Sequence, residues 1–339
     1  AKEAGVARTT VSLALRGGEG LAPETVEKIR EAAEKLGYRP NRLVHGLRSG
    51  RTGLIGVMIP PMDTFWAEVL FGVHDGLVER EYVPLVLWSN HRPTPDSEAD
   101  QLAQVHRLVD WRVDGAILWP LFANLYQEHI REFTDRDLPV VTVDGRLPDV
   151  FDADAVLSDE EMGAEAVASY LVDLGHRRIL HLAGPETQAW SHDRRHAFAA
   201  CLARAPACEL TELELPLTGS VDDEVRAALD SPSRPSAVFA ATDYFAEACY
   251  RAAESLGLRI PEDLSVVGCG DLSFAARMSP PLTSVGQRPY EMGRTAARLV
   301  ADAVGTPGSQ RTARLERLPM TLADRASVSP PAPLVSPDG

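Results

Sequence analysis

Short apolar runs alternate with amphipathic segments from residue 53 onward. Continuous runs rich in β-branched residues, separated by helices, are typical of parallel strands buried on both faces. The first series of predicted strands covers 53–60, 83–89, 113–120 and 138–144, with helices from the first strand to about residue 81 and over 96–110 and 123–135. A second series is expected to begin at 155–159 and to continue through 177–185, 209–217, 236–243 and 264–271, followed by a helix over 289–304 and a strand within 313–323. Two such series predict two doubly wound α/β lobes.

The first residues follow a helical period instead. Gly5 comes after AKEA, and glycine is suited to end a helix in the left-handed conformation. A second helix is expected over 8–16, and a third from Pro23 to Gly37, since proline suits the first helical turn. Helices joined by a tight glycine turn form a helix-turn-helix, whose second helix fits the major groove of DNA. The side chains left on the outside of that helix are Arg8, Thr9, Ser12 and Arg16.

Arginines bracket a short apolar stretch between this head and the first strand. In GYRPNRLVHGLRSGRT, apolar residues at helical spacing stand among Arg39, Arg42, Arg48 and Arg51. A linker that only separates two domains needs no such pattern. A short helix that orders on DNA does, with Leu47 wedged into the minor groove and the arginines on phosphates.

The charge distribution agrees with a head that meets phosphates. The 339-residue chain has a formal net charge of −15, yet residues 1–52 hold ten Lys and Arg against six Asp and Glu. The other 287 residues hold 24 basic and 43 acidic side chains. A basic head on an acidic body is expected when only the head contacts nucleic acid, although a solvated helix face produces the same imbalance.

Composition further limits the class of protein. The sequence contains no apolar run of membrane-spanning length and no basic-then-apolar leader, which predicts a cytoplasmic protein without a membrane partner. The four cysteines are scattered and form no CxxC pair, so they are expected to be small buried side chains in a reducing compartment: Cys201, Cys208, Cys249 and Cys269.

Two short motifs approach catalytic or metal-binding patterns without meeting them. GLRSGRTG at 46–53 has three residues between its glycines, where a phosphate-binding loop has four, and Arg in place of Lys. HDRRH at 192–196 places two histidines four residues apart, as in zinc-binding helices, but lacks a glutamate after the first; solvated helix polarity is the favoured interpretation. The sequence therefore predicts no enzyme, no cofactor and no metal site.

AGVARTTVSLAL and LGYRPNRLVHGLRSGRTGLIGV resemble the start of the lactose-repressor/galactose-repressor family of bacterial transcriptional regulators. Further matches follow in the family's order: LGHRRILHLAGP (174–185), Arg194 with Phe198 in RRHAF, IPEDLSVVG (260–268) and PPLTSV (280–285). The resemblance covers roughly residues 1–325 and implies two lobes like those of periplasmic sugar-binding proteins. The family carries several more residues before this start, so the chain is expected to be truncated there.

The resemblance and the hydrophobic pattern together divide the chain into five predicted segments. They are a helix-turn-helix DNA-binding domain over 1–38, a hinge over 39–52, an N-terminal effector-binding lobe over 53–158 with 289–316, a C-terminal lobe over 159–288 with 317–325, and a disordered proline-rich tail over 326–339.

By resemblance, the DNA-contacting side chains come from the second helix and the hinge. Arg8, Thr9 and Leu13 match positions that read bases, and Leu47 matches an intercalating leucine. The whole predicted set is Arg8, Thr9, Thr10, Ser12, Leu13, Arg16, Asn41, Arg42, His45 and Leu47. Ala7 replaces the serine that caps this helix in the family, which is expected to cost about 1 kcal/mol.

The resemblance also places a small-molecule effector between the lobes. Aromatic faces cover the C–H surface of a polyol, while a carboxylate and a guanidinium bind pairs of hydroxyls, so a sugar or sugar derivative is expected. The predicted lining is Phe65, Trp66, Trp119, Asp144, Arg194, Thr242, Asp243 and Asp271. As alternatives, Phe65 and Trp66 are core residues, and Asp144 and Asp243 are helix caps. Gly270 stands where sugar-binding members have an aspartate.

These observations predict a ligand-controlled repressor that binds a pseudo-palindromic double-stranded DNA operator as a homodimer. The alternative is a solute-binding protein of the periplasmic-binding type without DNA function, which residues 1–52 oppose. The sequence names neither the effector nor the operator.

Overall fold

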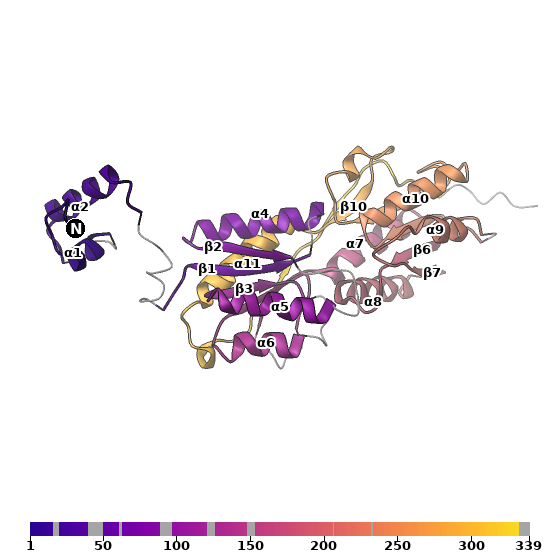
Figure 1. Ribbon diagram of the computed structural model, residues 1–339. Helices are drawn as coiled ribbons and strands as arrows, with labels where there is room; N and C mark the ends of the chain where they lie inside the picture. The colour runs from indigo at the N-terminus through magenta and orange to yellow at the C-terminus, as the bar shows by residue number, and fades with distance from the viewer. Residues whose placement is uncertain are drawn as a thin grey trace, which may run out of the picture. The chain divides into compact units, whose positions relative to one another are not determined.

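The computed structural model describes residues 1–15, 20–39, 50–60, 63–88, 97–120, 126–147, 153–205, 207–231 and 233–331. The chain forms two compact units, residues 1–53 and residues 54–339. The first unit is helical, and the second alternates strands with helices (Figure 1). Within these described ranges, no helix combines the length and the apolar character that crossing a membrane requires.

Two helices and a preceding turn are formed by the described residues of the first unit, 1–15, 20–39 and 50–53. α1 spans Arg8–Ala14 and α2 spans Pro23–Lys35. Gly5 has a φ angle of 65°, which confirms the predicted left-handed turn before α1. The buried centre of this unit consists of Ala4, Ala14 and Ile29, around which Val6, Val11, Leu15, Leu21, Val26 and Ala32 pack.

The second unit begins with a parallel six-stranded sheet in the order β11-β5-β4-β3-β1-β2. Its strands are β1 (Leu54–Ile59), β2 (Val83–Trp88), β3 (Gly115–Leu118), β4 (Val140–Val143), β5 (Asp154–Ser158) and β11 (Leu315–Leu318). The helices of this first lobe are α4 (Thr64–Val78), α5 (Ser97–Asp110), α6 (Tyr126–Thr134) and α11 (Pro289–Ala303). α4 packs against α11 on one face of the sheet, and α5 against α6 on the other (Figure 1).

The second lobe repeats this strand order as β12-β10-β9-β8-β6-β7, with only the β10–β12 pair antiparallel. Its strands are β6 (Arg178–Ala183), β7 (Glu209–Glu214), β8 (Ala237–Ala240), β9 (Ser265–Cys269), β10 (Thr283–Gly286) and β12 (Thr321–Ala323). Its helices are α7 (Glu160–Asp173), α8 (Ala189–Ala203), α9 (Asp222–Leu229) and α10 (Asp243–Ser255), and the short 3₁₀ turn η1 (Ala275–Arg277) also belongs to it. Another 3₁₀ turn, η2 (Gly308–Gln310), lies between α11 and β11 in the first lobe. Separate apolar cores lie under the α7/α8 pair and under the α9/α10 pair.

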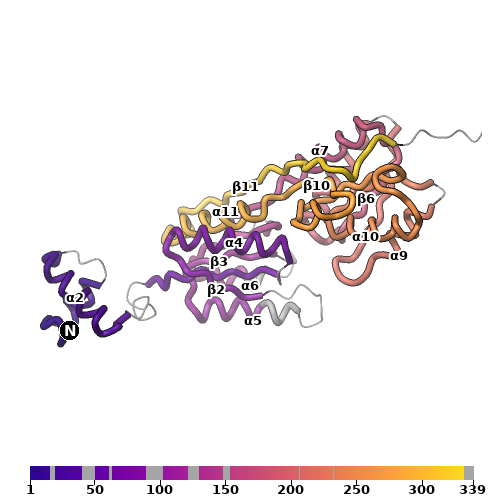
Figure 2. Tube along the Cα trace, turned by 90° about the horizontal axis from the view of Figure 1, so that it is seen from above, coloured from indigo at the N-terminus to yellow at the C-terminus, as the bar shows by residue number. Residues whose placement is uncertain are grey.

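Three crossings connect the lobes, after β5, after β10 and after β11 (Figure 2). The crossing after β11 leads to β12 in the second lobe, whereas the crossing after β10 brings α11 and β11 back into the first lobe. There α11 crosses α4 at glycines: a Cβ on Gly72 would overlap the carbonyl oxygen of Tyr290, and one on Gly293 would overlap that of Val69. The close approach of the two helix backbones is therefore possible only because glycine has no side chain at these two positions.

The strand prediction was wrong in grouping residues 155–159 with the second series, whereas the predicted N-terminal lobe over 53–158 contains this strand. This run is β5, which pairs with β4 in the first sheet rather than opening the second. β10 is an additional strand, and the strand expected within 313–323 is divided into β11 and β12, one in each sheet. β11 extends to Leu318, beyond the predicted lobe boundary at 316. Periodicity identifies a strand but not the distant strand that it pairs with.

The described part of the tail differs from the expected disorder. Ser327 is fully buried: its hydroxyl donates to the carbonyl of Val266 at 2.6 Å and accepts from the amide of Thr283 at 2.8 Å. Ser329 exchanges hydrogen bonds with the Ser265 side chain. These serines pair with the backbone of two neighbouring strands, which orders residues 326–331 in spite of their proline content.

Candidate functional site

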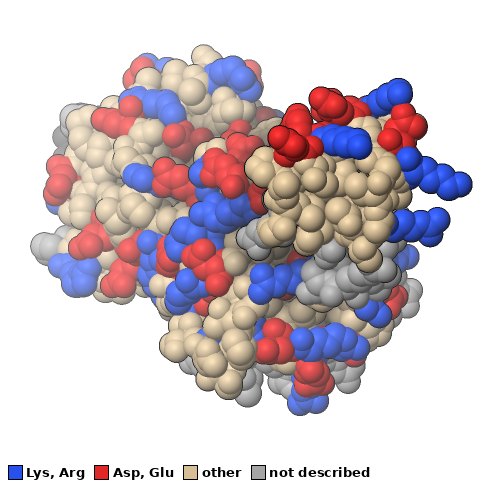
Figure 3. All heavy atoms as spheres, turned by 90° about the vertical axis from the view of Figure 1, so that its left-hand side faces the viewer, with Lys and Arg blue, Asp and Glu red and all other residues tan. Residues whose placement is uncertain are grey.

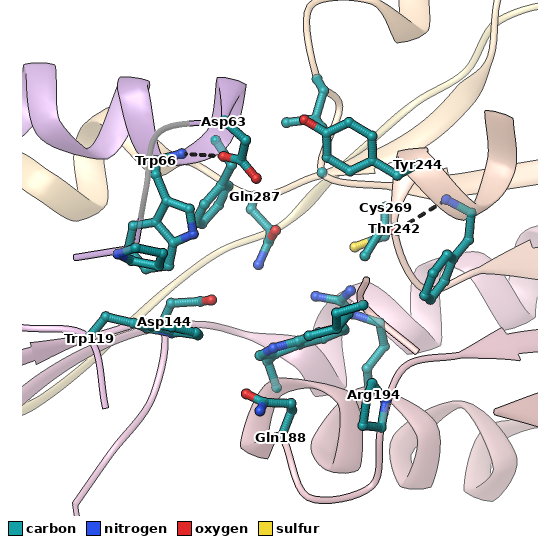
Figure 4. A pocket seen from close by; sticks show the side chains of 18 of the residues that line it. Asp63, Trp66, Trp119, Asp144, Gln188, Arg194, Thr242, Tyr244, Cys269 and Gln287 are labelled. Carbon is teal, nitrogen blue, oxygen red and sulfur yellow. Dashed lines mark hydrogen bonds between the residues drawn. The ribbon is translucent and has the colours of Figure 1, made fainter. Parts of the chain in front are cut away.

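A cavity of about 810 Å³ lies between the two lobes, at the carboxyl ends of their parallel strands. Side chains from the two lobes face each other across it (Figure 4). Doubly wound folds bind ligands at this edge of the sheet. The lining consists of Pro60, Asp63, Phe65, Trp66, Trp119, Asp144, Pro185, Thr187, Gln188, Trp190, Arg194, Pro216, Leu217, Thr218, Thr242, Tyr244, Phe245, Cys269, Gly270, Leu272 and Gln287.

Aromatic side chains of the first lobe form one wall of the cavity. The Trp66 ring packs edge-on against Phe65 and Trp119, at centroid separations of 5.2 and 5.4 Å. All three side chains are nearly buried and belong to the core of the lobe as well as to the lining. Asp63 caps α4 by accepting a hydrogen bond from the Trp66 amide at 2.9 Å, which fixes where the helix with Phe65 and Trp66 begins.

Asp144 adds a titratable group to the same side (Figure 4). It follows β4 with a φ angle of 54°, a left-handed conformation that aspartate tolerates better than most residues. Burial, reinforced by the negative charge of Glu160, raises the pKa of Asp144 to about 8 although Arg194 acts in the opposite direction. A carboxyl group that is protonated at pH 7 can donate a hydrogen bond as well as accept one. No such capacity was expected from the sequence.

Arg194 on α8 forms a buried ion pair in the opposite wall. Its Nε and Nη2 donate to the carboxylate of Glu160 at 2.7 and 2.9 Å, and Nη1 donates to the carbonyl of Ala241. The two charged side chains are only 3% and 6% exposed. The guanidinium carbon also lies 5.0 Å from the centroid of the Trp190 ring. These bonds occupy three of the five N–H groups of an arginine and leave one on each terminal nitrogen for a ligand.

The sequence analysis missed several polar residues at this site: Asp63, Glu160, Gln188, Tyr244 and Gln287. Gln287 lies at the crossing after β10, and its Nε2 donates to the Ser158 hydroxyl at 3.0 Å at the crossing after β5. The available signal was position, because Asp63, Glu160 and Gln287 each follow a strand within a few residues. Their side chains alone do not distinguish them from ordinary loop polarity.

Two residues that line the cavity, Thr242 and Gly270, also have a structural role that depends on the local backbone conformation. Thr242 lines the cavity and caps α10, since its hydroxyl accepts from the Phe245 amide at 3.2 Å. Gly270 also lines the cavity, with a φ angle of 125° that residues with side chains rarely adopt. An aspartate at position 270 would therefore be strained in this conformation.

The structure places Asp243 and Asp271 outside the cavity lining, which corrects their assignment to it. Asp243 is fully buried and accepts from the Leu272 amide at 2.7 Å and the Ser284 hydroxyl at 2.6 Å, so it ties the β9 and β10 ends together. Burial raises its pKa to about 6. Asp271 accepts from Arg325 at 2.6 Å. Both carboxylates are occupied by structural partners.

The predicted DNA-contacting residues within the described ranges lie along α1. Arg8 and Thr9 are exposed, Thr10 and Ser12 are half-buried, and Leu13 is 38% exposed. Ala7 precedes α1 without a capping hydrogen bond from its side chain. The other predicted members lie outside the described residues: Arg16, Asn41, Arg42, His45 and Leu47. On the face drawn in Figure 3, basic and acidic side chains are interspersed, so charge alone does not locate a DNA surface there.

Comparison with known proteins gives matches at both ends of the chain. Residues 1–41 match the family model of bacterial regulatory proteins of the lacI family, and residues 168–328 match that of the periplasmic binding protein-like domain. The chain is 30% identical over 339 residues to the ribose operon repressor of Escherichia coli (strain K12), which covers 96% of this chain and 98% of that protein.

Solved structures resemble the whole chain. The lac repressor dimer bound to operator and the anti-inducer ONPF has a TM-score of 0.84 at 24% identity, with 97% of each chain covered. The complex of the transcriptional regulator CelR with cellobiose has a TM-score of 0.70 at 28% identity, covering 96% of this chain and 97% of that one.

Proposed function

Because the chain belongs to the lacI family of bacterial regulatory proteins, we propose that it is a ligand-responsive transcriptional repressor. Its first unit binds operator DNA, and a small molecule in the inter-lobe cavity controls that binding. The observation that carries this proposal is the presence, on one chain, of a helical unit that matches the lacI family model and a cavity at the strand ends of two α/β lobes. A DNA partner places the protein in the bacterial cytoplasm, and the proposal involves no catalysis.

The DNA-binding part of the proposal relies on the exposed face of α1. Arg8 and Thr9 present a guanidinium and a hydroxyl to solvent, which are groups that bind base edges and phosphates. They lie on the helix that the family uses for recognition. The hinge residues, Leu47 among them, remain predicted partners of the minor groove.

The ligand part relies on the chemistry of the two walls. Phe65, Trp66 and Trp119 offer apolar ring surface, while Asp144 and Arg194 offer hydrogen-bond donors and acceptors opposite them. This combination suits a sugar or sugar derivative, whose rings carry both C–H and hydroxyl groups. The sugar bound by CelR agrees with this ligand class. A cavity of about 810 Å³ is large enough for a disaccharide-sized ligand.

A homodimer follows from the family and from the surface of the first lobe. Large apolar side chains are exposed on α4 and on the edge strand β2, at 45–60% of their area: Phe71, Val78, Val83 and Trp88. Large exposed apolar side chains are candidates for an interface, and a two-fold axis would bring the same surface of both chains together. Two heads related by such an axis would bind a pseudo-palindromic operator.

Control of DNA binding follows from the position of the cavity between lobes. A ligand that contacts Trp66 on one lobe and Arg194 on the other changes the free energy of lobe closure. Closure in turn changes the geometry of the first lobe, from which the hinge leads to the head. Such couplings are typically about 1–3 kcal/mol.

One experiment tests both parts in sequence. A thermal-shift screen of mono- and disaccharides identifies a ligand, since a molecule that binds only the native protein raises its midpoint. The affinity of the full-length chain for DNA is then measured with and without this ligand, at two salt concentrations. Salt-dependent DNA binding that the ligand shifts by about 5- to 150-fold is expected. Ligand binding without any DNA binding would instead favour the solute-binding alternative.

A further inference from the structure

Three side chains of metal-ligating type meet at the start of α8, beside the cavity. Glu186, in the loop before α8, has its Oε1 2.7 Å from His192 Nδ1 and 3.0 Å from His196 Nε2. The two imidazole rings lie 4.2 Å apart on successive turns of the helix. From the sequence alone, solvated helix polarity was the favoured interpretation of the histidine pair, and no metal site was predicted. The carboxylate that the fold brings to it is the new observation.

We propose that Glu186, His192 and His196 bind a divalent transition-metal ion such as Zn²⁺ or Ni²⁺. Imidazole nitrogens and a carboxylate oxygen are ligands that these ions favour. The three ligand atoms all lie within 4.8 Å of one another. Ligands at about 2.1 Å from a tetrahedral ion are about 3.4 Å apart, so the contacts of His192 and His196 to Oε1 need to lengthen by about 0.7 and 0.4 Å. Rotation of the two exposed imidazoles provides this change.

The hydrogen bonds around the Glu186 carboxylate suit its role as a metal ligand, because they orient it through the oxygen that does not face the histidines. Arg195 Nη1 donates to Glu186 Oε2 at 2.7 Å, so it fixes the carboxylate and leaves Oε1 directed at the histidines. The positive charge of Arg195 is offset by Glu214, whose carboxylate lies 3.0 Å from Nη2. Outer hydrogen bonds of this kind orient metal ligands. Asp193, on the same helix turn, is a further exposed negative charge.

The main alternative is an ion pair in which protonated histidines donate to Glu186. Both explanations use the same three side chains, but they differ in pH dependence. A metal ion competes with protons for the imidazole nitrogens and loses affinity on acidification, whereas an ion pair with Glu186 needs the protonated imidazoles. Metal affinity that falls on acidification therefore separates the two.

Binding would also connect two elements that line the cavity. Pro185 and Thr187 flank Glu186 in the loop, and Trp190 and Arg194 lie on α8 among the histidines. An ion held by the loop and the helix would restrict their relative movement. A higher midpoint of thermal unfolding is therefore expected with the metal.

The test uses the full-length chain without a histidine tag, freed of metal with a chelator. Calorimetric titration with Zn²⁺, and separately with Ni²⁺, at pH 7.5 is expected to show one saturable site per chain. His196→Gln and Glu186→Gln should each lower the affinity for the metal ion at least about tenfold, and lowering the pH to 5.5 should also lower it about tenfold or more. His74→Gln is the matched control, because His74 pairs with Asp75 at 3.1 Å and is exposed.

The variants alter exposed or half-exposed side chains, and circular dichroism of the metal-free proteins checks that each is folded. Absence of saturable binding to the parent chain overturns the proposal. Equal affinity in the parent and His196→Gln proteins also overturns it, since the ion would then bind elsewhere. Neither result depends on DNA or on the effector, so the proposed repressor function stands or falls separately.

Discussion

The head, residues 1–53, and the body, residues 54–339, present their proposed binding groups in opposite ways. In the head, Arg8 and Thr9 are exposed on α1, while the buried centre is made by other, apolar side chains. In the body, Trp66 is part of the core and Arg194 belongs to a buried ion pair. The side chains proposed to bind the ligand there also hold the fold together.

This difference has consequences for mutation. Substitutions on the exposed face of α1 are expected to change DNA binding with little effect on stability, because exposed side chains seldom contribute more than about 0.5 kcal/mol. Substitutions in the cavity are expected to change ligand binding and the free energy of unfolding together. A ligand site built from the core is rigid before the ligand arrives.

The largest effect is expected for Arg194→Ala. The substitution leaves the Glu160 carboxylate buried without its partner, which costs about 3–5 kcal/mol of the free energy of unfolding of the body. Ligand binding should be lost in the same variant. Urea unfolding measures the first effect, and calorimetry the second.

A double variant sharpens this result. Replacing both Arg194 and Glu160 by leucine removes both charges, and it should be less destabilised than Arg194→Ala alone. If the free energy of unfolding of Arg194→Ala lay within about 1 kcal/mol of the parent value, the ion pair would not stabilise the body.

Ile29→Ala is expected to break the head while sparing the body. Ile29 is the largest side chain in the small centre of the head, and truncating a buried isoleucine costs about 2–5 kcal/mol. Because so small a unit has a small free energy of unfolding, the substitution should unfold the head. DNA binding should then disappear while the unfolding transition of the body is unchanged. Leu36→Ala, at a side chain that is 61% exposed, is the control. If DNA affinity survives Ile29→Ala, the head does not depend on this centre.

Asp144→Asn should change the pH dependence of the body. Because the folded protein raises the pKa of Asp144 to about 8, it retains a proton between about pH 4 and pH 8 that the unfolded chain has released. Asp144 therefore makes stability fall as the pH rises through this window, by at most about 1.4 kcal/mol per pH unit. The asparagine variant should be flatter than the parent in urea unfolding from pH 5 to 8. Parallel curves would contradict a protonated Asp144.

The smallest effect is expected for Ala7→Ser. Ala7 occupies the N-cap of α1 in an extended conformation, without a side-chain hydrogen bond. A serine there can accept from the amides of the first turn and should stabilise the head by about 1 kcal/mol. Hydrogen exchange of the α1 amides measures the gain, and Ala7→Gly is the control without a hydroxyl. Loss of protection in the serine variant would mean that the cap geometry is not reached.

The sequence predicted local features better than pairings. The apolar runs located most strands, Gly5 located the left-handed turn before α1, and Pro23 located the start of α2, because these signals depend on neighbouring residues. The grouping of residues 155–159 with the second series of strands was wrong, since the strand that this run pairs with is determined by distant contacts.

The candidate site shows the same limit. The family resemblance implied Phe65, Trp66, Trp119, Asp144, Arg194 and Thr242, which the structure brings into one cavity. Asp243 and Asp271 were predicted as well, but hydrogen bonds to Ser284 and Arg325 occupy them. Glu160, the partner of Arg194, lies 34 residues away in sequence, and nothing local indicates such a pair. These roles depend on which groups meet after folding.

Selection of binding sites from a pool of randomised double-stranded DNA, with the full-length chain, tests the central claim most directly. The account predicts enrichment of sequences that contain an inverted repeat, because two heads related by a two-fold axis read equivalent half-sites. Recovery of unrelated sequences, or binding that shows no preference at any salt concentration, would contradict it.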